Sequence, residues 1–292
     1  MKTPLCSRRA LFAFLSVPLL AAGKRSALLI DGQNNHDWKA TTPLLRQYLE
    51  ETGLFTVAVA TTPEKGGDMA AFRPRFEDHD LVVLNYNGED WSKETEASFE
   101  KFVAGGKGVV VVHAANNAFP TWPAYNEMIG IGGWGGRTEG SGPYLRLRQG
   151  RWTPEVRPGK SGHHGKQHAF AITVQNPAHP IVKGLPPVWM HANDELYDSL
   201  RGPAKNVQVL ASAYSDPATG GTGEHEPMLM VIPYKKGRVF HTALGHATEA
   251  MRSIDFVVTY QRGAEWAATG KVTQKLPALL PTETEVRQRA EP

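Results

Sequence analysis

Short apolar runs alternate with amphipathic segments along the first half of the chain. Continuous strand-like runs occupy residues 26–30, 57–60, 81–84 and 108–112. Helical patterns with one apolar face occupy residues 41–51 and 92–103. Apolar, β-branched runs without polar alternation are typical of parallel strands that are buried on both faces. The pattern therefore predicts an α/β fold with a doubly wound, mostly parallel sheet.

The first predicted helix has sequence signals at both of its ends. Thr42 is a candidate N-cap, and Pro43 would then occupy the first helical position, where its missing amide proton costs nothing. Gly53 follows Glu51 closely and favours termination there. These signals predict a helix from Thr41 to Glu51.

The middle of the chain departs from the alternation of strands and helices. Residues 130–165 are rich in Gly, Arg and Trp and lack apolar periodicity, which predicts a long loop at the rim of a site. The later elements are expected at residues 169–174, 207–211, 228–232, 237–244 and 256–268. We predict one domain over residues 24–272, with loop and strand insertions, and a weakly ordered tail over residues 273–292.

The N-terminal residues have the composition of an export signal. Arg8 and Arg9 precede an apolar run at residues 11–20 that is too short to span a bilayer, and small residues follow at 21–23. The paired arginines favour twin-arginine export, and a Sec signal is the alternative. We expect residues 1–23 to be removed and the protein to be periplasmic or secreted, with no membrane anchor. Mass spectrometry of protein from its own host should then find an N-terminus near Lys24.

Removal of this segment changes the charge balance of the chain. The full sequence has 32 basic and 29 acidic residues, and the signal contains three of the basic ones, so 29 of each kind remain. A nucleic-acid partner would require a basic face, which this balance does not provide. Cys6, the only cysteine, leaves with the signal. The mature fold therefore has no disulfide and no thiol nucleophile.

Three of the predicted strands end in polar motifs that contain histidine. His36 follows the first strand, His113 follows the fourth, and His246 follows the strand that ends at residue 244. The carboxyl ends of the strands in a doubly wound sheet meet at one edge, where ligands bind. Neutral imidazoles suit Zn²⁺ and similar divalent ions. We expect one metal or catalytic pocket at this edge, although each histidine also fits an ordinary hydrogen-bonding or capping role.

Glu195 offers a carboxylate to the same pocket. It would act as the fourth metal ligand or as a general base, and a surface position is the alternative. In an extended segment Glu195 and Tyr197 point the same way. We therefore expect Glu195, His113 and Tyr197 to carry the catalysis. The metal ligands would be His36, His113, His246 and Glu195.

Polar and aromatic side chains near these motifs are candidates for binding a polar ligand. The turn after the first strand lacks the Gly-x-Gly-x-x-Gly pattern of a dinucleotide site, and amides and imidazole take its place. His164 and His168 are four residues apart, but flanking glycines disfavour a helix, so a metal site and a closing loop both remain open. The expected substrate-binding residues are Asn35, Trp38, Asn116, Asn117, His164 and His168.

Taken together, these motifs resemble the ThuA-like family, named for a trehalose-utilisation protein. The resemblance covers roughly residues 26–270. It rests on the motifs at residues 36–38, 110–117, 164–170, 179–185, 194–197, 237–246 and 262–268. It implies a flavodoxin-like, class I glutamine-amidotransferase-like fold, but no amidotransferase activity, because the usual nucleophilic cysteine of that superfamily is missing. It also implies a carbohydrate substrate, because the family is associated with trehalose, related disaccharides and enzymes that make 3-keto sugars.

The leading hypothesis is an exported, metal-assisted enzyme that acts on a disaccharide or a 3-keto-glycoside by lyase, hydrolase or isomerase chemistry. A 3-keto group acidifies the neighbouring C2 proton, so a base and a Lewis acid would together assist elimination or isomerisation. Trp38, Trp134 and Tyr197 would stack on sugar faces or belong to the core. One alternative is a non-catalytic carbohydrate-binding protein. Another is a direct glycoside hydrolase that pairs Glu195 with Asp194 or Asp37.

Overall fold

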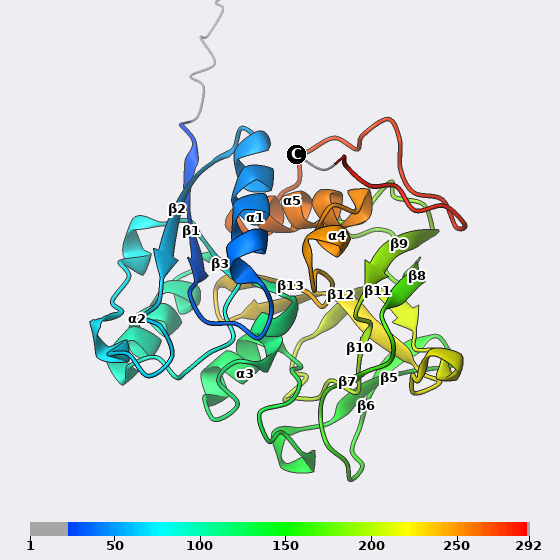
Figure 1. The fold of residues 1–292 in the computed structure, drawn as a ribbon, viewed down its shortest axis with the longest axis horizontal. Coiled ribbons are helices and arrows are strands. Elements are labelled where there is room, and N and C mark those ends of the chain that lie inside the picture. The colour runs from blue at the N-terminus through cyan, green and yellow to red at the C-terminus, as the bar shows by residue number, and fades with distance from the viewer. Residues whose placement is uncertain (1–22, 291–292) are drawn as a thin grey trace, which may run out of the picture.

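A nine-stranded sheet runs through the molecule in the computed structural model, which describes residues 23–290 (Figure 1). The strand order is β2-β1-β3-β4-β13-β12-β11-β8-β9. Nearly all of the expected export signal, including Cys6, lies outside the described residues. No helix within residues 23–290 is long and apolar enough to cross a membrane.

One half of the sheet is parallel. It comprises β1 (Arg25–Asp31), β2 (Phe55–Thr61), β3 (Leu81–Leu84), β4 (Gly108–Val112) and β13 (Gly237–Thr242). Its order, with β13 as the fifth parallel strand, is the flavodoxin-like order 2-1-3-4-5. The side chains of Val109–Val112 are buried on both faces, which is why this segment is uniformly apolar. The predicted flavodoxin-like α/β fold is confirmed.

The other half of the sheet is antiparallel and makes up the strand insertions. It comprises β12 (His225–Tyr234), β11 (Gln208–Tyr214), β8 (His168–Val174) and β9 (Val188–Asp194). Two small ribbons lie beside it. They are formed by β5 (Tyr144–Arg148) with β6 (Arg151–Glu155), and by β7 (His163–His164) with β10 (Tyr197–Asp198).

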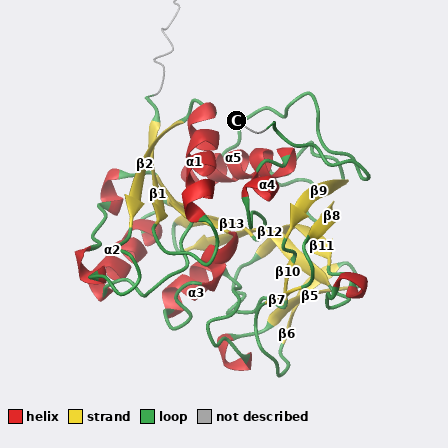
Figure 2. Ribbon diagram, viewed as in Figure 1, coloured by secondary structure: helices red, strands yellow, loops and turns green. Residues whose placement is uncertain are grey.

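Helices cover both faces of the parallel half (Figures 1 and 2). One face carries α1 (Trp38–Glu51), α4 (Thr248–Met251) and α5 (Ile254–Thr269), and the other carries α2 (Lys93–Ala104) and α3 (Pro123–Ile129). Helix α5 packs very closely on β13, and Gly263 makes this possible. A Cβ at that position would lie 2.1 Å from the Phe240 ring. Strands β4 and β13 pair directly, with Thr242 opposite Val112, so their carboxyl ends lie side by side.

Helix α1 begins earlier than the sequence signals predicted. Its N-cap is Asp37, whose side chain accepts a hydrogen bond from the Ala40 amide at 3.1 Å, and Pro43 lies inside the helix. The expected start with Thr42 as cap was therefore wrong. A carboxylate caps a helix N-terminus more effectively than threonine does, because it also complements the helix dipole.

Two segments are more ordered than expected. Residues 130–165, predicted as a long loop, contain the β5–β6 hairpin, in which Arg146 is fully buried against Glu226 at 2.8 Å. Residues 273–290, expected to be weakly ordered, contain little regular structure but hydrogen-bond to the domain. The Thr273 amide donates to the Glu265 carboxylate at 2.8 Å. Arg146 and Glu226 are 80 residues apart in the sequence, so local patterns do not reveal that pair.

Candidate functional site

Three histidines from three strand ends meet at one edge of the sheet. His36 lies in the loop after β1, His113 directly follows β4, and His246 lies in the loop after β13. The centroid of the His36 ring is 5.0 Å from that of His113 and 4.5 Å from that of His246. The structure thus brings together the three imidazoles that the sequence placed at strand ends.

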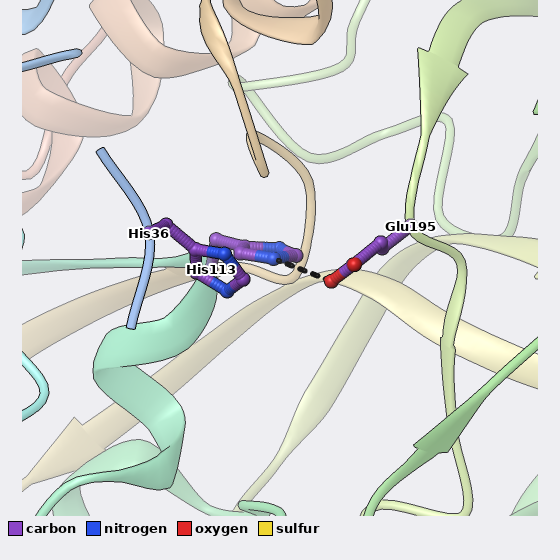
Figure 3. A group of neighbouring side chains, drawn as sticks. All are labelled: His36, His113 and Glu195. Atoms are coloured by element: carbon purple, nitrogen blue, oxygen red, sulfur yellow. Dashed lines mark ion pairs between the residues drawn. The ribbon is translucent and has the colours of Figure 1, made fainter. Parts of the chain in front are cut away.

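Glu195 reaches this cluster from the antiparallel half of the sheet, one residue after β9. Its Oε2 lies 3.5 Å from Nε2 of His113, and its Oε1 lies 3.2 Å from Nε2 of His246. One possible ligand atom from each of His36, His113 and Glu195 lies within 4.8 Å of the other two. Figure 3 shows these three side chains directed toward a common space. Two imidazoles and a carboxylate in this arrangement have the donor chemistry of a zinc-type site.

The orientation of His113 is fixed by the backbone. Its Nδ1 lies 2.7 Å from the carbonyl oxygen of Ala243 and donates a proton to it. Its Nε2 is buried and has no hydrogen-bond partner among the described residues. His113 also has a φ of 45°, an uncommon backbone conformation for a residue other than glycine, and such strain is concentrated at functional sites. A metal-binding histidine typically donates its other ring proton to a carbonyl in this way.

The charges of the cluster depend on burial and on its neighbours. Burial alone would raise the pKa of Glu195, but His113, with its Nε2 at 3.5 Å, together with the charges that His246 and His164 carry when protonated, lowers it to about 2. Burial, followed by repulsion from His113 and His246, lowers the pKa of His36 to about 4. Burial also lowers the pKa of His246. At neutral pH the ionised Glu195 carboxylate therefore faces the neutral imidazole of His36.

Tyr197 forms one wall of the cluster. Its ring stacks on His113 with centroids 4.0 Å apart, and its hydroxyl lies 3.2 Å from Nε2 of His36. Burial and the charge of Glu195 raise the pKa of Tyr197 far above its usual range. The side chain therefore remains a phenol, and its hydroxyl is available as a hydrogen-bond donor.

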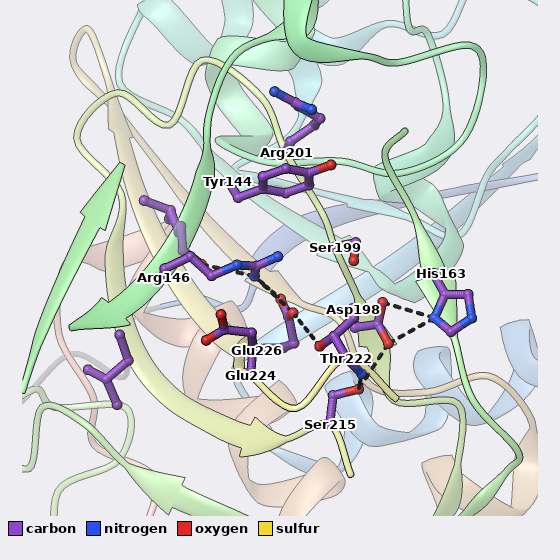
Figure 4. A network of polar contacts seen from close by, with 12 residues as sticks. Tyr144, Arg146, His163, Asp198, Ser199, Arg201, Ser215, Thr222, Glu224 and Glu226 are labelled. Carbon is purple, nitrogen blue, oxygen red and sulfur yellow. Dashed lines mark hydrogen bonds and ion pairs between the residues drawn. The ribbon is translucent and has the colours of Figure 1, made fainter. Parts of the chain in front are cut away.

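A second polar network lies in the β7–β10 ribbon, next to Tyr197 and His164. Asp198, the partner of His163 in this ribbon, accepts from Nδ1 of His163 at 3.0 Å and from the Ser215 hydroxyl at 2.9 Å (Figure 4). His164 and Tyr197 are the adjacent pair of the same ribbon. Nε2 of His164 consequently lies 3.6 Å from Oε1 of Glu195.

The cluster opens into a polar cavity of about 360 Å³. Its lining residues are Asn35, His36, Asn87, Asn117, Trp134, Gly135, His164, Glu195 and Tyr197. This volume is within the range, roughly 300–1,000 Å³, of small-molecule sites. Amides, imidazoles and two aromatic rings around a carboxylate provide partners for a ligand that is rich in hydroxyl groups. We refer to this space as the inner cavity.

The structure separates the predicted substrate-binding residues into two groups. Asn35, Asn117 and His164 line the inner cavity, and Trp38 lines a neighbouring one. The other two, Asn116 and His168, do not line the inner cavity, in contrast to the prediction.

Asn116 is fully buried, with its Nδ2 3.1 Å from Nε2 of His241, because the 3-10 turn after β4 directs it into the core. The His168 ring, at the start of β8, turns back to the Lys166 carbonyl, with its Nδ1 2.7 Å from that oxygen. Neither residue is among those that line the inner cavity.

Two further residues contribute to the site: Asp194, which the sequence offered only as a second carboxylate for direct hydrolysis, and Asn87, which sequence patterns missed. Asp194 is fully buried and accepts hydrogen bonds from the backbone amides of Gly245 at 2.7 Å and His246 at 3.0 Å. It therefore ties the His246 loop to the end of β9. Asn87 follows β3 and lines the inner cavity. Its position after an apolar strand is the same signal that identified His36 and His113.

Comparisons with known proteins agree with this architecture. The family model described as ThuA, trehalose utilisation, matches residues 26–267. A solved structure of a ThuA-like protein from Parabacteroides merdae is 46% identical with a TM-score of 0.89, and the match covers 91% of this chain and 98% of that one.

A ThuA-like protein from Bacteroides uniformis is 17% identical with a TM-score of 0.58 over 91% of this chain and 98% of its own, which shows a shared fold alone. No curated protein matches the chain. On the strength of the family match and the 46% identity to a ThuA-like protein, the chain belongs to the ThuA family.

Proposed function

We propose that this protein is an exported, metal-assisted enzyme that acts on a disaccharide or its 3-keto derivative. The observation that carries the proposal is the buried Nε2 of His113. This atom has no hydrogen-bond partner and faces Oε2 of Glu195 at 3.5 Å, while Nδ1 is occupied by a backbone carbonyl. When His113 is neutral, its Nε2 lone pair faces the Glu195 carboxylate, and a cation bound between the two groups would remove the resulting repulsion.

The residues present fit a divalent metal such as Zn²⁺. His36, His113 and Glu195 would hold the ion, and His246, with its Nε2 3.2 Å from Glu195, would complete the set. Such an ion, when bound, polarises a carbonyl or hydroxyl oxygen of the substrate. The Glu195 carboxylate, with a pKa of about 2, is a weak base and is better suited to ligation than to proton abstraction.

Other residues of the inner cavity would move protons and orient the sugar. Nδ1 of His164 donates to the carbonyl of Gly165 at 2.8 Å, which leaves its Nε2 as an acceptor at the cavity wall. We assign His164 to accept the proton that becomes acidic beside a 3-keto group, and Glu195 stabilises the imidazolium that forms. The Tyr197 phenol donates a hydrogen bond to a sugar oxygen, and Trp134 packs against the ring.

A direct two-carboxylate hydrolase has less support. Glu195 is the only carboxylate among the described residues that line the inner cavity. Asp194 is occupied by backbone amides and His191, and Asp37 caps helix α1. A non-catalytic carbohydrate-binding protein on the same fold remains the second candidate, because the amides and aromatic rings alone would serve binding.

The test is the metal content and activity of untagged protein. His113→Ala and His246→Ala should each lose bound metal, by elemental analysis, and lose activity on a 3-keto-glycoside while remaining folded. His79→Ala is the matched control, because His79 precedes β3 at the opposite edge of the sheet and bonds to Ser26 there.

Wild-type protein that carries no stoichiometric metal and keeps full activity in a chelator would overturn the metal role. Activity on an unoxidised glycoside alone would favour direct hydrolysis, and metal-free binding without turnover would favour the binding protein.

A further inference from the structure

A second cavity adjoins the inner one. It has a volume of about 560 Å³, and its lining includes Gln33, Trp38, Lys39, Lys65, Asn87 and Glu89. Asn35 and Asn87 line both cavities, and the Asn87 amide donates to Oδ1 of Asn35 at 2.6 Å. We call this space the outer cavity. The Asn35–Asn87 pair marks the junction between the two.

The outer cavity lies at a position where this topology favours a ligand. Its walls include residues 32–35, after β1, and residues 87–89, after β3, and these two parallel strands are neighbours. From β1 the chain proceeds to β2 on one side, while β3 and β4 lie on the other. Loops at such a switch point diverge, and open α/β sheets bind ligands in the resulting crevice.

The base of the outer cavity is prebuilt. Oε1 of Gln33 accepts from the Glu89 amide at 2.9 Å, and Nε2 of Gln33 donates to the Pro63 carbonyl at 2.9 Å. A Cβ at Gly88 would lie 2.4 Å from Cβ of Gln33, so the two loops approach this closely only because residue 88 is glycine. A ligand therefore meets a wall that is already ordered, which lowers the entropic cost of binding.

The chemistry of the lining indicates a neutral ligand rich in hydroxyl groups. Two lysines, Lys39 and Lys65, are balanced by two glutamates, Glu64 and Glu89. A phosphate or carboxylate ligand would require a net positive lining, which is absent from these walls. The amides and carboxylates offer hydrogen bonds to hydroxyl groups, and the Trp38 indole offers an apolar surface for the C–H face of a sugar ring.

We infer that the outer cavity is a second sugar subsite, which binds the ring of a disaccharide that does not react. The inner cavity then holds the reacting ring beside Glu195, and the Asn35–Asn87 pair lies at the glycosidic linkage. This inference rests on the proposed carbohydrate function. It assigns Trp38 to recognition of the second ring, which makes the site selective for two-ring substrates over one-ring glycosides.

The experiment compares binding of two sugars by titration calorimetry, without turnover. The probes are trehalose, with two rings, and methyl α-glucoside, with one. Trp38→Ala should weaken trehalose binding about tenfold, the loss expected when an aromatic contact of about 1.4 kcal/mol is removed. Binding of methyl α-glucoside should change less than twofold. Trp38→Phe should retain most of the trehalose affinity, and Trp152→Ala, in the distant β6 strand, should affect neither sugar.

The outcomes distinguish this inference from the proposed function. If folded Trp38→Ala weakens both sugars equally, or neither, the subsite is overturned while the carbohydrate function stands. If the wild type binds neither trehalose nor methyl α-glucoside, the subsite is overturned, and the proposed function is decided separately by turnover of a 3-keto-glycoside. Should Trp38→Ala fail to fold, Trp38→Leu preserves apolar volume at the start of α1 and carries the same expectations.

Discussion

At the scale of single residues, a buried histidine organises the site without touching the cavity. Nδ1 of His191 lies 2.8 Å from Asp255, and its Nε2 lies 3.0 Å from Asp194. Burial alone would lower the pKa of His191, but the two carboxylates raise it to about 10. Because Asp194 holds the amides of Gly245 and His246, His191 is a positioning residue for the cluster of His36, His113, His246 and Glu195.

We predict that His191→Gln lowers the free energy of unfolding by about 3 kcal/mol at pH 7, because it leaves two buried carboxylates without their cation. The pKa of His191 in the folded protein, about 10, lies above the ordinary value of 6.5. Its stabilising contribution is therefore full below pH 6.5 and is lost as the pH rises through 10. Urea denaturation should therefore show a smaller difference in the free energy of unfolding between wild type and variant at pH 10 than at pH 7.

His241→Gln is the control for this titration. Burial lowers the pKa of His241 to about 4, so this histidine is neutral throughout the range from pH 7 to 10. The effect of its substitution should be the same at both pH values. A His191→Gln effect that is equally independent of pH would contradict the charged interpretation of the cluster.

At the scale of elements, the strands that the sequence predicted are those whose apolar pattern reflects burial. Residues 109–112 are uniformly Val because β4 is covered on both faces, and they locate His113 without further information. The start of α1 was mispredicted because the sequence offers two candidate N-caps, Asp37 and Thr42. Local sequence rules do not determine which of them the folded chain uses.

Strand β9 shows why the rest of the site could not be derived from pattern. It contains His191, Asn193 and Asp194, whose polar groups find partners on α5, on α4 and in the loop after β13. Its pairing with β8 directs Glu195 toward the histidines, and no local periodicity encodes that pairing. Sequence reasoning identified Glu195 by residue type and motif, while its distances to the imidazoles required the sheet.

The loop after β4 also shows that local sequence does not determine which side chains reach the site. Asn116 and Asn117 are adjacent and chemically identical, yet one is buried against His241 and the other lines the inner cavity. A 3-10 turn over His113–Asn117 rotates successive side chains by about a third of a turn, so neighbours face different surroundings. The composition of the turn led us to expect both asparagines at the ligand, whereas its backbone geometry brings Asn117, and not Asn116, to the inner cavity.

At the scale of the whole molecule, the candidate site joins the two halves of the sheet. The parallel half supplies His36, His113 and His246, and the segment that follows antiparallel strand β9 supplies Glu195 and Tyr197. An ion held between the halves would therefore bind only when both are folded and docked. Its binding free energy would add to the stability of the complete domain and not to that of either half alone.

We predict that Zn²⁺ at a free concentration one hundred times its dissociation constant stabilises the metal-free protein by about 2.7 kcal/mol. For a domain of this size that corresponds to a rise in Tm of roughly 5–10 °C, observed by calorimetry as one transition that moves as a whole. Glu195→Gln should abolish most of the rise, because it removes the ligand from the antiparallel half. Glu94→Gln, on the exposed face of α2, should retain it. A rise of equal size in Glu195→Gln, or two transitions of which only one moves, would show that the ion does not bridge the halves.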